Sequence, residues 1–304
     1  MNRPRIIVFA YSEPGYVCLN ELIKAKANVV AVYTHQDDPD EEIWFHSVYD
    51  LAKQNNIPVF RPKKIDEETA QYIKQLKPEL IFSFYYRRLI PNEIILMPRL
   101  GSYNLHGALL PKYRGQTCIN WAVVNGEKYT GATLHLMTEK ADDGDIVDQR
   151  SFEIAFTDTS IDVFKKVSVI AGKIVHDNLN NIEAGIVNLT PQDNSKATKF
   201  PRRRPKDGFL DFNKDAISLY NLIRGVTHPF PGAFAFVGDK KLFIWWAKPL
   251  DGKGDIGEIV SVKPLCVGTG NGLLQLEKLQ WENGQELTAS HFTKDLPVGT
   301  KFNI

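Results

Sequence analysis

An α/β fold with a second, smaller domain is predicted by three observations along the 304 residues. Short β-branched runs alternate with helix-like spacings through the first half of the chain. A polar, basic and proline-bearing segment follows at 193–208, and after it come short strands separated by glycine-rich turns. The expected architecture is a Rossmann-like parallel sheet with helices on both faces, plus a small C-terminal β-barrel domain that is OB-like.

The first half supplies the elements of the parallel sheet. The strand-like runs in order are 5–10, 28–34, 57–60, 79–86 and 101–106. Helix-like spacing occupies the stretches between them at 15–26, 43–56 and 66–77. Further along, the patterns predict a helix at 119–126, strands at 131–138 and 145–154, and a long helix over 160–184. In sheets of this kind ligands gather at the carboxyl ends of the strands.

The domain boundaries follow from the change in sequence pattern at the polar, basic segment 193–208. We expect a catalytic domain over 1–192, a linker over 193–208 and the OB-like domain over 209–304, which starts with a helix near 214–226. The segment GTGNG at 268–272 superficially resembles a dinucleotide-binding fingerprint. Its glycines are evenly spaced and no helix follows, so a hairpin turn is expected there and NAD binding has no support.

Composition limits the class of protein. Lys and Arg total 37 against 36 Asp and Glu, so the net charge of +1 does not call for nucleic acid or an acidic membrane as partner. Three scattered cysteines, Cys18, Cys118 and Cys266, fit neither a disulfide framework nor a zinc site. No stretch approaches the ~20 apolar residues of a membrane span. We therefore expect a cytoplasmic protein without membrane insertion.

Asn104 and His106 are the first candidates for chemistry. They stand two positions apart at the end of an apolar run, before a glycine and proline turn. Alternate residues of a strand share a face, so both side chains would point the same way. An amide donor beside a titratable ring suits acyl transfer. On spacing alone, hydrogen-bonded strand-end residues without a catalytic role remain the alternative.

An acidic turn supplies the third candidate. The segment EKADDGD at 139–145 gathers Asp142, Asp143 and Asp145 around Gly144. A carboxylate near His106 would orient the ring and favour its charged form. By itself the segment favours a solvated acidic turn over a functional site. The aspartates lack the ligand pattern of a calcium or magnesium loop, so no metal is expected.

The block NLHGALLPKYRG at 104–115, followed by the D-x-G of 142–144, resembles the folate-dependent formyltransferases, which transfer a formyl group from 10-formyltetrahydrofolate to an amine. The resemblance covers essentially the whole chain. Within the family the likeness is greatest to the branch that formylates UDP-4-amino-4-deoxy-L-arabinose. The segments that carry it, besides this block, are 81–90, 120–135, 202–210 and 228–238.

The resemblance implies roles for individual residues. Asn104 would stabilise the oxyanion, His106 would handle the proton, and Asp142 would raise the pKa of His106. Folate would lie against Arg88, Leu89 and Ile90 and against the backbone of Thr138, Glu139, Lys140, Ala141 and Asp142. Gln116 stands where relatives carry arginine and cannot supply a guanidinium charge at that folate contact.

The acceptor amine has more than one candidate. Methionyl-tRNA formyltransferase shares the catalytic residues and the two-domain layout. The loop at 34–45, however, holds five acidic residues between Asp37 and Glu42, which would repel RNA. The cluster PRRRPK at 201–206 could contact either RNA or the diphosphate of a sugar nucleotide, or be a solvated linker. The expected acceptor is a nucleotide-linked amino sugar, UDP-4-amino-4-deoxy-L-arabinose, and the alternatives are a dTDP-4-amino sugar and methionyl-tRNA.

Other functions and partners remain open from the sequence. A hydrolase that deformylates folate could use the same three residues with water as acceptor, and a non-catalytic nucleic-acid-binding module would depend on 201–206 alone. Trp245 and Trp246 could stack on a base, although core packing is the commoner role of such strand residues. The family's arabinose enzyme is often fused to a decarboxylase, so a stand-alone enzyme, a homo-oligomer or part of such a fusion all fit. The implied pathway is cationic decoration of lipid A.

Overall fold

A computed structural model describes residues 3–39 and 41–303. The chain divides into two compact units, which are described separately. The first takes in the chain up to Cys118 together with Tyr129–Glu153 and Val163–Pro201. The second takes in Ile119–Lys128, Ile154–Asp162 and the chain from Arg202 onward. The predicted domains, 1–192 and 209–304, are single continuous ranges, whereas each of these units combines several segments of the chain. The predicted limits therefore remain predictions.

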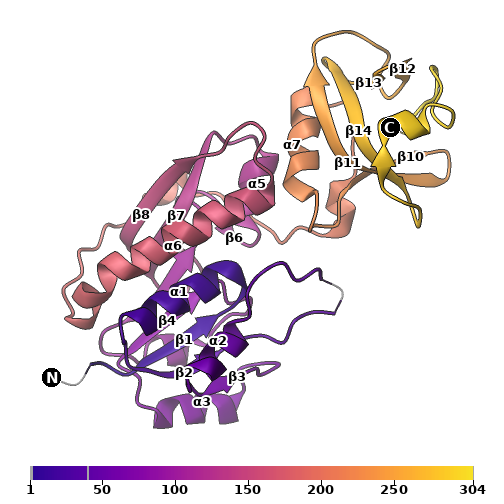
Figure 1. Cartoon of the computed structure of the whole chain (residues 1–304). Coiled ribbons are helices and arrows are strands. Elements are labelled where there is room, and N and C mark those ends of the chain that lie inside the picture. The colour runs from indigo at the N-terminus through magenta and orange to yellow at the C-terminus, as the bar shows by residue number, and fades with distance from the viewer. Residues whose placement is uncertain (1–2, 40, 304) are drawn as a thin grey trace. The chain divides into compact units, whose positions relative to one another are not determined.

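The first unit is built on a seven-stranded sheet (Figure 1). Its strands are β1 (Ile6–Ala10), β2 (Val29–Tyr33), β3 (Val59–Phe60), β4 (Leu80–Phe84), β5 (Ser102–His106), β7 (Tyr129–Leu136) and β8 (Ile146–Glu153). The spatial order is β3-β2-β1-β4-β5-β7-β8. The pairs from β3 to β5 are all parallel, which confirms the predicted parallel sheet. The β5–β7 and β7–β8 pairs are antiparallel, so the sheet is mixed at that end.

Helices cover both faces of this sheet, as predicted. They are α1 (Ser12–Lys24), α2 (Val48–Gln54), α3 (Glu67–Gln75), α4 (Asn92–Ile95) and α6 (Ser160–Glu183), whereas α5 (Cys118–Val124) belongs to the second unit from Ile119 onward. One face of β1, β2 and β4 packs against α3 and α4 through Ile7, Phe9, Ala31, Tyr33, Ile81, Ala70, Ile73, Ile94 and Ile95. The other face receives α1, where a Cβ on Gly15 would lie 3.3 Å from the Cβ of Ala10. Alternation along each strand thus buries both faces.

Helix starts agree with local chemistry. The side chains of Ser47 and Asp66 accept hydrogen bonds from the backbone N–H groups of Asp50 and Thr69, which caps α2 and α3. The predicted helix over 43–56 is shorter in the structure because this cap starts it at Val48. Segment 193–208 contains two short 3-10 helices, η1 (Asn194–Lys196) and η2 (Pro205–Gly208), and the strand β9 (Lys199–Phe200). β9 pairs in parallel with β6 (Arg114–Gly115).

The second unit carries an antiparallel sheet in the order β10-β11-β14-β13-β12, with β15 beside β14. Its elements are α7 (Ala216–Val226), β10 (Ala233–Val237), β11 (Lys240–Leu250), β12 (Ile259–Val262), β13 (Leu265–Gly268), β14 (Leu273–Trp281), β15 (Leu287–Thr288) and the 3-10 helix η3 (Ala289–Phe292). Alternate residues of β10 and β11, including Ala233, Ala235, Leu242 and Ile244, pack with α7 in its core. GTGNG connects β13 to β14, which pair with Gly268 opposite Leu273, so the predicted hairpin is confirmed.

Candidate active site

Strand β5 carries Asn104 and His106. Asn104 pairs with Ser83 of β4 on one side and with His135 of β7 on the other, and His106 pairs with Thr133. Since successive side chains of a strand alternate, Asn104, His106, Thr133 and His135 share one face of the sheet. His106 is the last residue of β5, at the carboxyl end of a parallel strand.

Asp142 lies against this face, in the turn that joins β7 to β8. Its Oδ1 is 3.6 Å from Nδ1 of His106 and 3.7 Å from Nε2 of His135. Its Oδ2 accepts a 2.9 Å hydrogen bond from the backbone N–H of Gly115. The structure therefore brings the imidazole of His106 and the carboxylate of Asp142 together. Asn104 lies two residues before His106 on the same face of β5.

The charges of the pair support one another. Burial opposes the charged form of His106, whose side chain is 6% exposed. The contacts with Cys118 and Asp142 and the hydrogen bond that Nε2 donates to the carbonyl oxygen of Tyr113 at 2.8 Å outweigh it and raise the pKa of His106 to about 10. Burial likewise opposes the charge of Asp142, but the positive charge of His106 and the hydrogen bond from the backbone N–H of Gly115 hold the pKa of that carboxyl well below its usual range. Both shifts favour an imidazolium beside a carboxylate.

His135 is a site residue that the sequence analysis did not single out. Its Nε2 accepts a 3.1 Å hydrogen bond from Nδ2 of Asn104, and its Nδ1 lies 2.7 Å from the carbonyl oxygen of Leu136. The ring is 1% exposed. The sequence could have pointed to His135 only through its position in the predicted strand 131–138. Its contact with Asn104 depends on the pairing of two strands, which the sequence does not show.

Gln192 and Arg114 are two further residues near the site that were not predicted from the sequence. Nε2 of Gln192 donates to the carbonyl oxygens of Asp142 at 3.0 Å and Gly144 at 2.7 Å. Its Oε1 accepts from the guanidinium of Arg114 at 2.7 Å. These bonds tie the turn that carries Asp142 to the segment that follows α6. Nothing in the sequence links residues so far apart.

The residues predicted to contact folate lie in two turns. Arg88, Leu89 and Ile90 follow β4 at its carboxyl end, where Leu89 is 85% exposed and Ile90 is buried. Thr138, Glu139, Lys140 and Ala141 are exposed in the turn after β7. The Arg88 guanidinium donates to the carbonyl oxygen of Pro62. Gln116 is exposed directly after Gly115.

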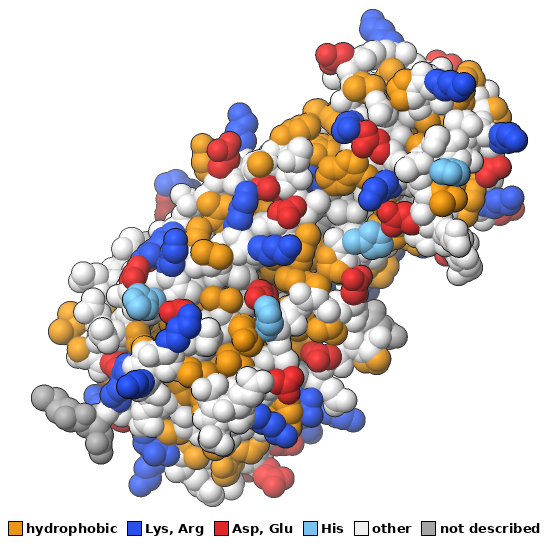
Figure 2. Space-filling model, viewed as in Figure 1, with side chains coloured by type: hydrophobic (Ala, Val, Ile, Leu, Met, Phe, Trp, Pro, Cys, Tyr) orange, Lys and Arg blue, Asp and Glu red, His pale blue; other side chains and the backbone are white. Residues whose placement is uncertain are grey.

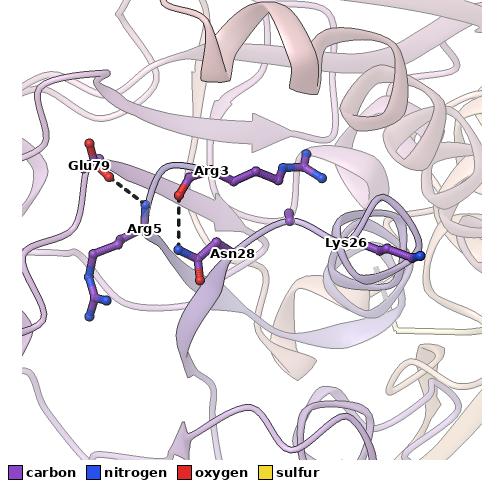
Figure 3. A pocket seen from close by; sticks show the side chains of 6 residues that line it. Arg3, Arg5, Lys26, Asn28 and Glu79 are labelled. Atoms are coloured by element: carbon purple, nitrogen blue, oxygen red, sulfur yellow. Dashed lines mark hydrogen bonds between the residues drawn. The ribbon is translucent and has the colours of Figure 1, made fainter. Parts of the chain in front are cut away.

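A hollow of about 610 Å³ lies elsewhere, at the amino ends of β1, β2 and β4, and is thus at the opposite edge of the sheet from His106 (Figure 3). It is lined by Arg3, Arg5, Lys26, Ala27, Asn28 and Glu79. Arg3 pairs with Glu183 at 2.9 Å, and the backbone N–H of Arg5 donates to Glu79 at 3.0 Å. None of the groups described above lines this hollow, so it is separate from the candidate site.

Metal and membrane features can be stated for the part of the chain that the structure describes. There, no group of three or more His, Cys, Asp or Glu residues is placed to hold a metal ion. None of the described helices is long and apolar enough to span a bilayer.

The basic cluster 201–206 is partly engaged within the second unit. The Arg203 guanidinium lies 4.4 Å from the ring centroid of Trp121, and it donates to the carbonyl oxygen of Asp207 at 2.5 Å. Burial lowers the pKa of Arg203. Trp245 is 7% exposed and stacks on His228. Arg203 is thus half-buried, and Trp245 packs inside the protein.

Comparison with known proteins gives consistent matches over both parts of the chain. Residues 5–179 match the family model described as formyl transferase, and residues 203–297 match the formyl transferase C-terminal domain. Over 280 residues the chain is 42% identical to the bifunctional polymyxin resistance protein ArnA of Wigglesworthia glossinidia brevipalpis. That match covers 91% of this chain and 43% of the relative, so the chain spans less than half of its length.

Solved structures share the fold. An N-formyltransferase from Helicobacter canadensis, in complex with folinic acid and dTDP-3-aminofucose, has a TM-score of 0.70 at 19% identity, covering 94% of this chain and all of that one. HypX from Aquifex aeolicus, in complex with tetrahydrofolic acid, has a TM-score of 0.64 at 20% identity, covering 97% of this chain and 48% of that chain. The α/β class with a β-rich second part is confirmed.

Proposed function

Because the chain belongs to the formyl transferase family, we propose that it transfers the formyl group of 10-formyltetrahydrofolate to the 4-amino group of a nucleotide-linked amino sugar, UDP-4-amino-4-deoxy-L-arabinose. The observation that carries the proposal is the grouping of Asn104, His106 and Asp142 on one face of the sheet. The cytoplasm is the proposed location.

Each of the three groups has a task in that reaction. Attack of the amine on the formyl carbon puts negative charge on the formyl oxygen, and Nδ2 of Asn104 is a donor that can receive it. A single well-placed donor of this kind is worth roughly 3–4 kcal/mol. The raised pKa of His106 favours its charged form, and that positive charge would stabilise the same oxygen. Asp142 keeps that charge in place.

The proton also has a route. The amine must lose a proton and N10 of the folate must gain one when the C–N bond breaks. Nε2 of His106 is engaged with the carbonyl of Tyr113, whereas Nδ1 lies 3.6 Å from Oδ1 of Asp142. We assign the exchangeable proton to Nδ1, which gives it to the leaving nitrogen and regains one from the amine.

Folate recognition rests on the two turns already described. Leu89 is 85% exposed and offers an apolar surface to a flat heterocycle. The exposed backbone of 138–141 offers hydrogen-bonding groups beside the residue that holds His106. The chain's residues therefore fit a reduced folate as co-substrate.

A sugar nucleotide is favoured over tRNA on charge. Basic and acidic side chains are interspersed over the face shown in Figure 2, without a continuous basic surface. In the loop after β2, Glu41 pairs with Arg87 at 2.7 Å and Asp37 accepts from Tyr11, so carboxylates occupy it. Affinity for tRNA comes mainly from Lys and Arg contacts with phosphates. The ArnA likeness and the dTDP-3-aminofucose complex of the Helicobacter enzyme support a nucleotide sugar.

The test compares acceptors under one assay. The purified protein is given 10-formyltetrahydrofolate with UDP-4-amino-4-deoxy-L-arabinose, a dTDP-4-amino sugar or methionyl initiator tRNA, and tetrahydrofolate formation and the formylated product are measured. We expect turnover with the UDP sugar. Turnover with tRNA alone would refute the proposal, and formate release without any acceptor would indicate a hydrolase.

A further inference from the structure

We propose that His135 is a positioning residue for this reaction, which holds the carboxamide of Asn104 in the one orientation that stabilises the oxyanion. The expected effect on kcat rests on the proposed function. The contact between the side chains of His135 and Asn104 does not depend on it.

The contact follows from strand register. Asn104 in β5 and His135 in β7 are directly paired across an antiparallel ladder. Side chains of such a pair emerge on the same face with their Cβ atoms roughly 4.5–5.5 Å apart. Backbone pairing therefore brings the amide to the ring, and Nδ2 of Asn104 reaches Nε2 of His135 at 3.1 Å.

The partners of the ring define its protonation. Nδ1 of His135 lies 2.7 Å from the carbonyl oxygen of Leu136, which can only accept, so Nδ1 carries a hydrogen. Nε2 faces an amide nitrogen, which can only donate, so Nε2 is bare. The ring is the neutral Nδ1–H tautomer.

A competing contact with Asp142 does not change this assignment. Oδ1 of Asp142 lies 3.7 Å from Nε2, beyond hydrogen-bond range, whereas Nδ2 of Asn104 is within it. A hydrogen on Nε2 would point at the amide hydrogens of Asn104. The carboxylate is instead served by the imidazolium of His106 and the backbone N–H of Gly115.

The neutral ring leaves Asn104 a single orientation. One amide hydrogen is committed to Nε2, and the second stays available to the developing oxyanion. Turning the carboxamide by 180° would set its oxygen against the bare Nε2, so that two acceptors would face each other in a site where His135 is 1% exposed. His135 thus selects the orientation in which Asn104 presents a donor.

Two substitutions separate this role from a merely structural one. His135→Gln places an acceptor oxygen near the position of Nε2 and keeps the bond to Asn104. His135→Asn places its amide near the position of Nδ1, so it keeps the bond to the Leu136 carbonyl and loses the acceptor for Asn104. Both replace the ring with a neutral amide.

We expect His135→Asn to lower kcat by roughly 10- to 100-fold, because a misplaced catalytic group costs about that much. KM for folate and for the sugar nucleotide should change far less, and His135→Gln should recover most of kcat. In an Asn104→Ala background, His135→Asn should add little further loss, because the group that it positions is already gone. Equal kcat losses in the Gln and Asn variants, or full additivity with Asn104→Ala, would overturn the proposal.

A spectroscopic experiment needs no acceptor substrate. In ¹⁵N-labelled protein at neutral pH, the nitrogen resonances of His135 should show the Nδ1–H tautomer. A coupling across the hydrogen bond should connect Nε2 to the side-chain nitrogen of Asn104. That coupling should disappear in Asn104→Ala. A doubly protonated ring or the Nε2–H tautomer would refute the assignment. If no amino sugar is formylated, the proposed function fails while this result still decides the contact.

Discussion

The backbone N–H of Gly115 donates a 2.9 Å hydrogen bond to Oδ2 of Asp142, and this bond joins the two halves of the motif in space. Gly115 ends the block that begins at Asn104, and Asp142 opens the D-x-G. Because the other carboxylate oxygen faces His106, the position of Gly115 bears directly on the charge pair.

Gly115→Ala should therefore weaken both stability and turnover. Gly115 has φ +101°, and an added Cβ would lie 2.4 Å from the carbonyl oxygen of Phe200. We expect a lower melting temperature and a kcat reduced by about tenfold, the effect of a weakened hydrogen bond to a charged group. Gly238→Ala is the matched control, because Gly238 has φ +57° with nothing within 4 Å. An equal kcat loss in that control would contradict the explanation.

Replacing the proposed catalytic side chains should affect chemistry more than folate binding. We expect Asn104→Ala to lower kcat by roughly 10²–10³-fold, as loss of an oxyanion donor does. His106→Ala should lower it by about 10²–10⁴-fold. Steady-state kinetics and a fluorescence titration with tetrahydrofolate separate the two effects. Unchanged turnover in either variant would remove that residue from the mechanism.

The raised pKa of His106 predicts a pH-dependent stability. Burial opposes the charge, but contacts with Cys118 and Asp142 raise the folded-state pKa to about 10, whereas the unfolded value is about 6.5. Between these values the native state binds the extra proton, so the contribution of His106 is complete below pH ~6.5 and is lost as the pH rises toward ~10.

Urea unfolding of the wild type and of His106→Gln tests this over that range. The free energy of unfolding of the wild type should fall relative to the variant, with a slope of at most about 1.4 kcal/mol per pH unit. Asp142 stays ionised throughout, because its pKa is held below the usual range. A difference that is constant with pH would show that His106 is not charged in the folded protein.

Gln192→Leu should loosen the turn that carries Asp142. The substitution removes the donor to the carbonyls of Asp142 and Gly144 and the acceptor for Arg114. We expect faster amide hydrogen exchange in 142–145 and a lower kcat. The control is Gln54→Leu, on the exposed side of α2. Unchanged exchange in 142–145 would show that Gln192 does not hold this turn.

Local patterns were enough to predict much of the fold. Strand and helix periods located the parallel strands β1, β2 and β4 and the long helix α6, because each depends on residues close in sequence. The antiparallel addition of β7 and β8 was not predicted. Its direction depends on how the chain returns to the sheet edge after His106, and the strand pattern alone carries no information on direction.

At the site, the two-residue period of one strand was enough to predict that Asn104 and His106 share a face. The residues that lie opposite them became known from the folded structure. His135 meets Asn104 through the register of β5 and β7, Gly115 and Gln192 hold the turn of Asp142 from distant segments, and Cys118 reaches His106. These contacts join residues far apart in the chain, so they depend on packing and strand pairing that no local pattern encodes.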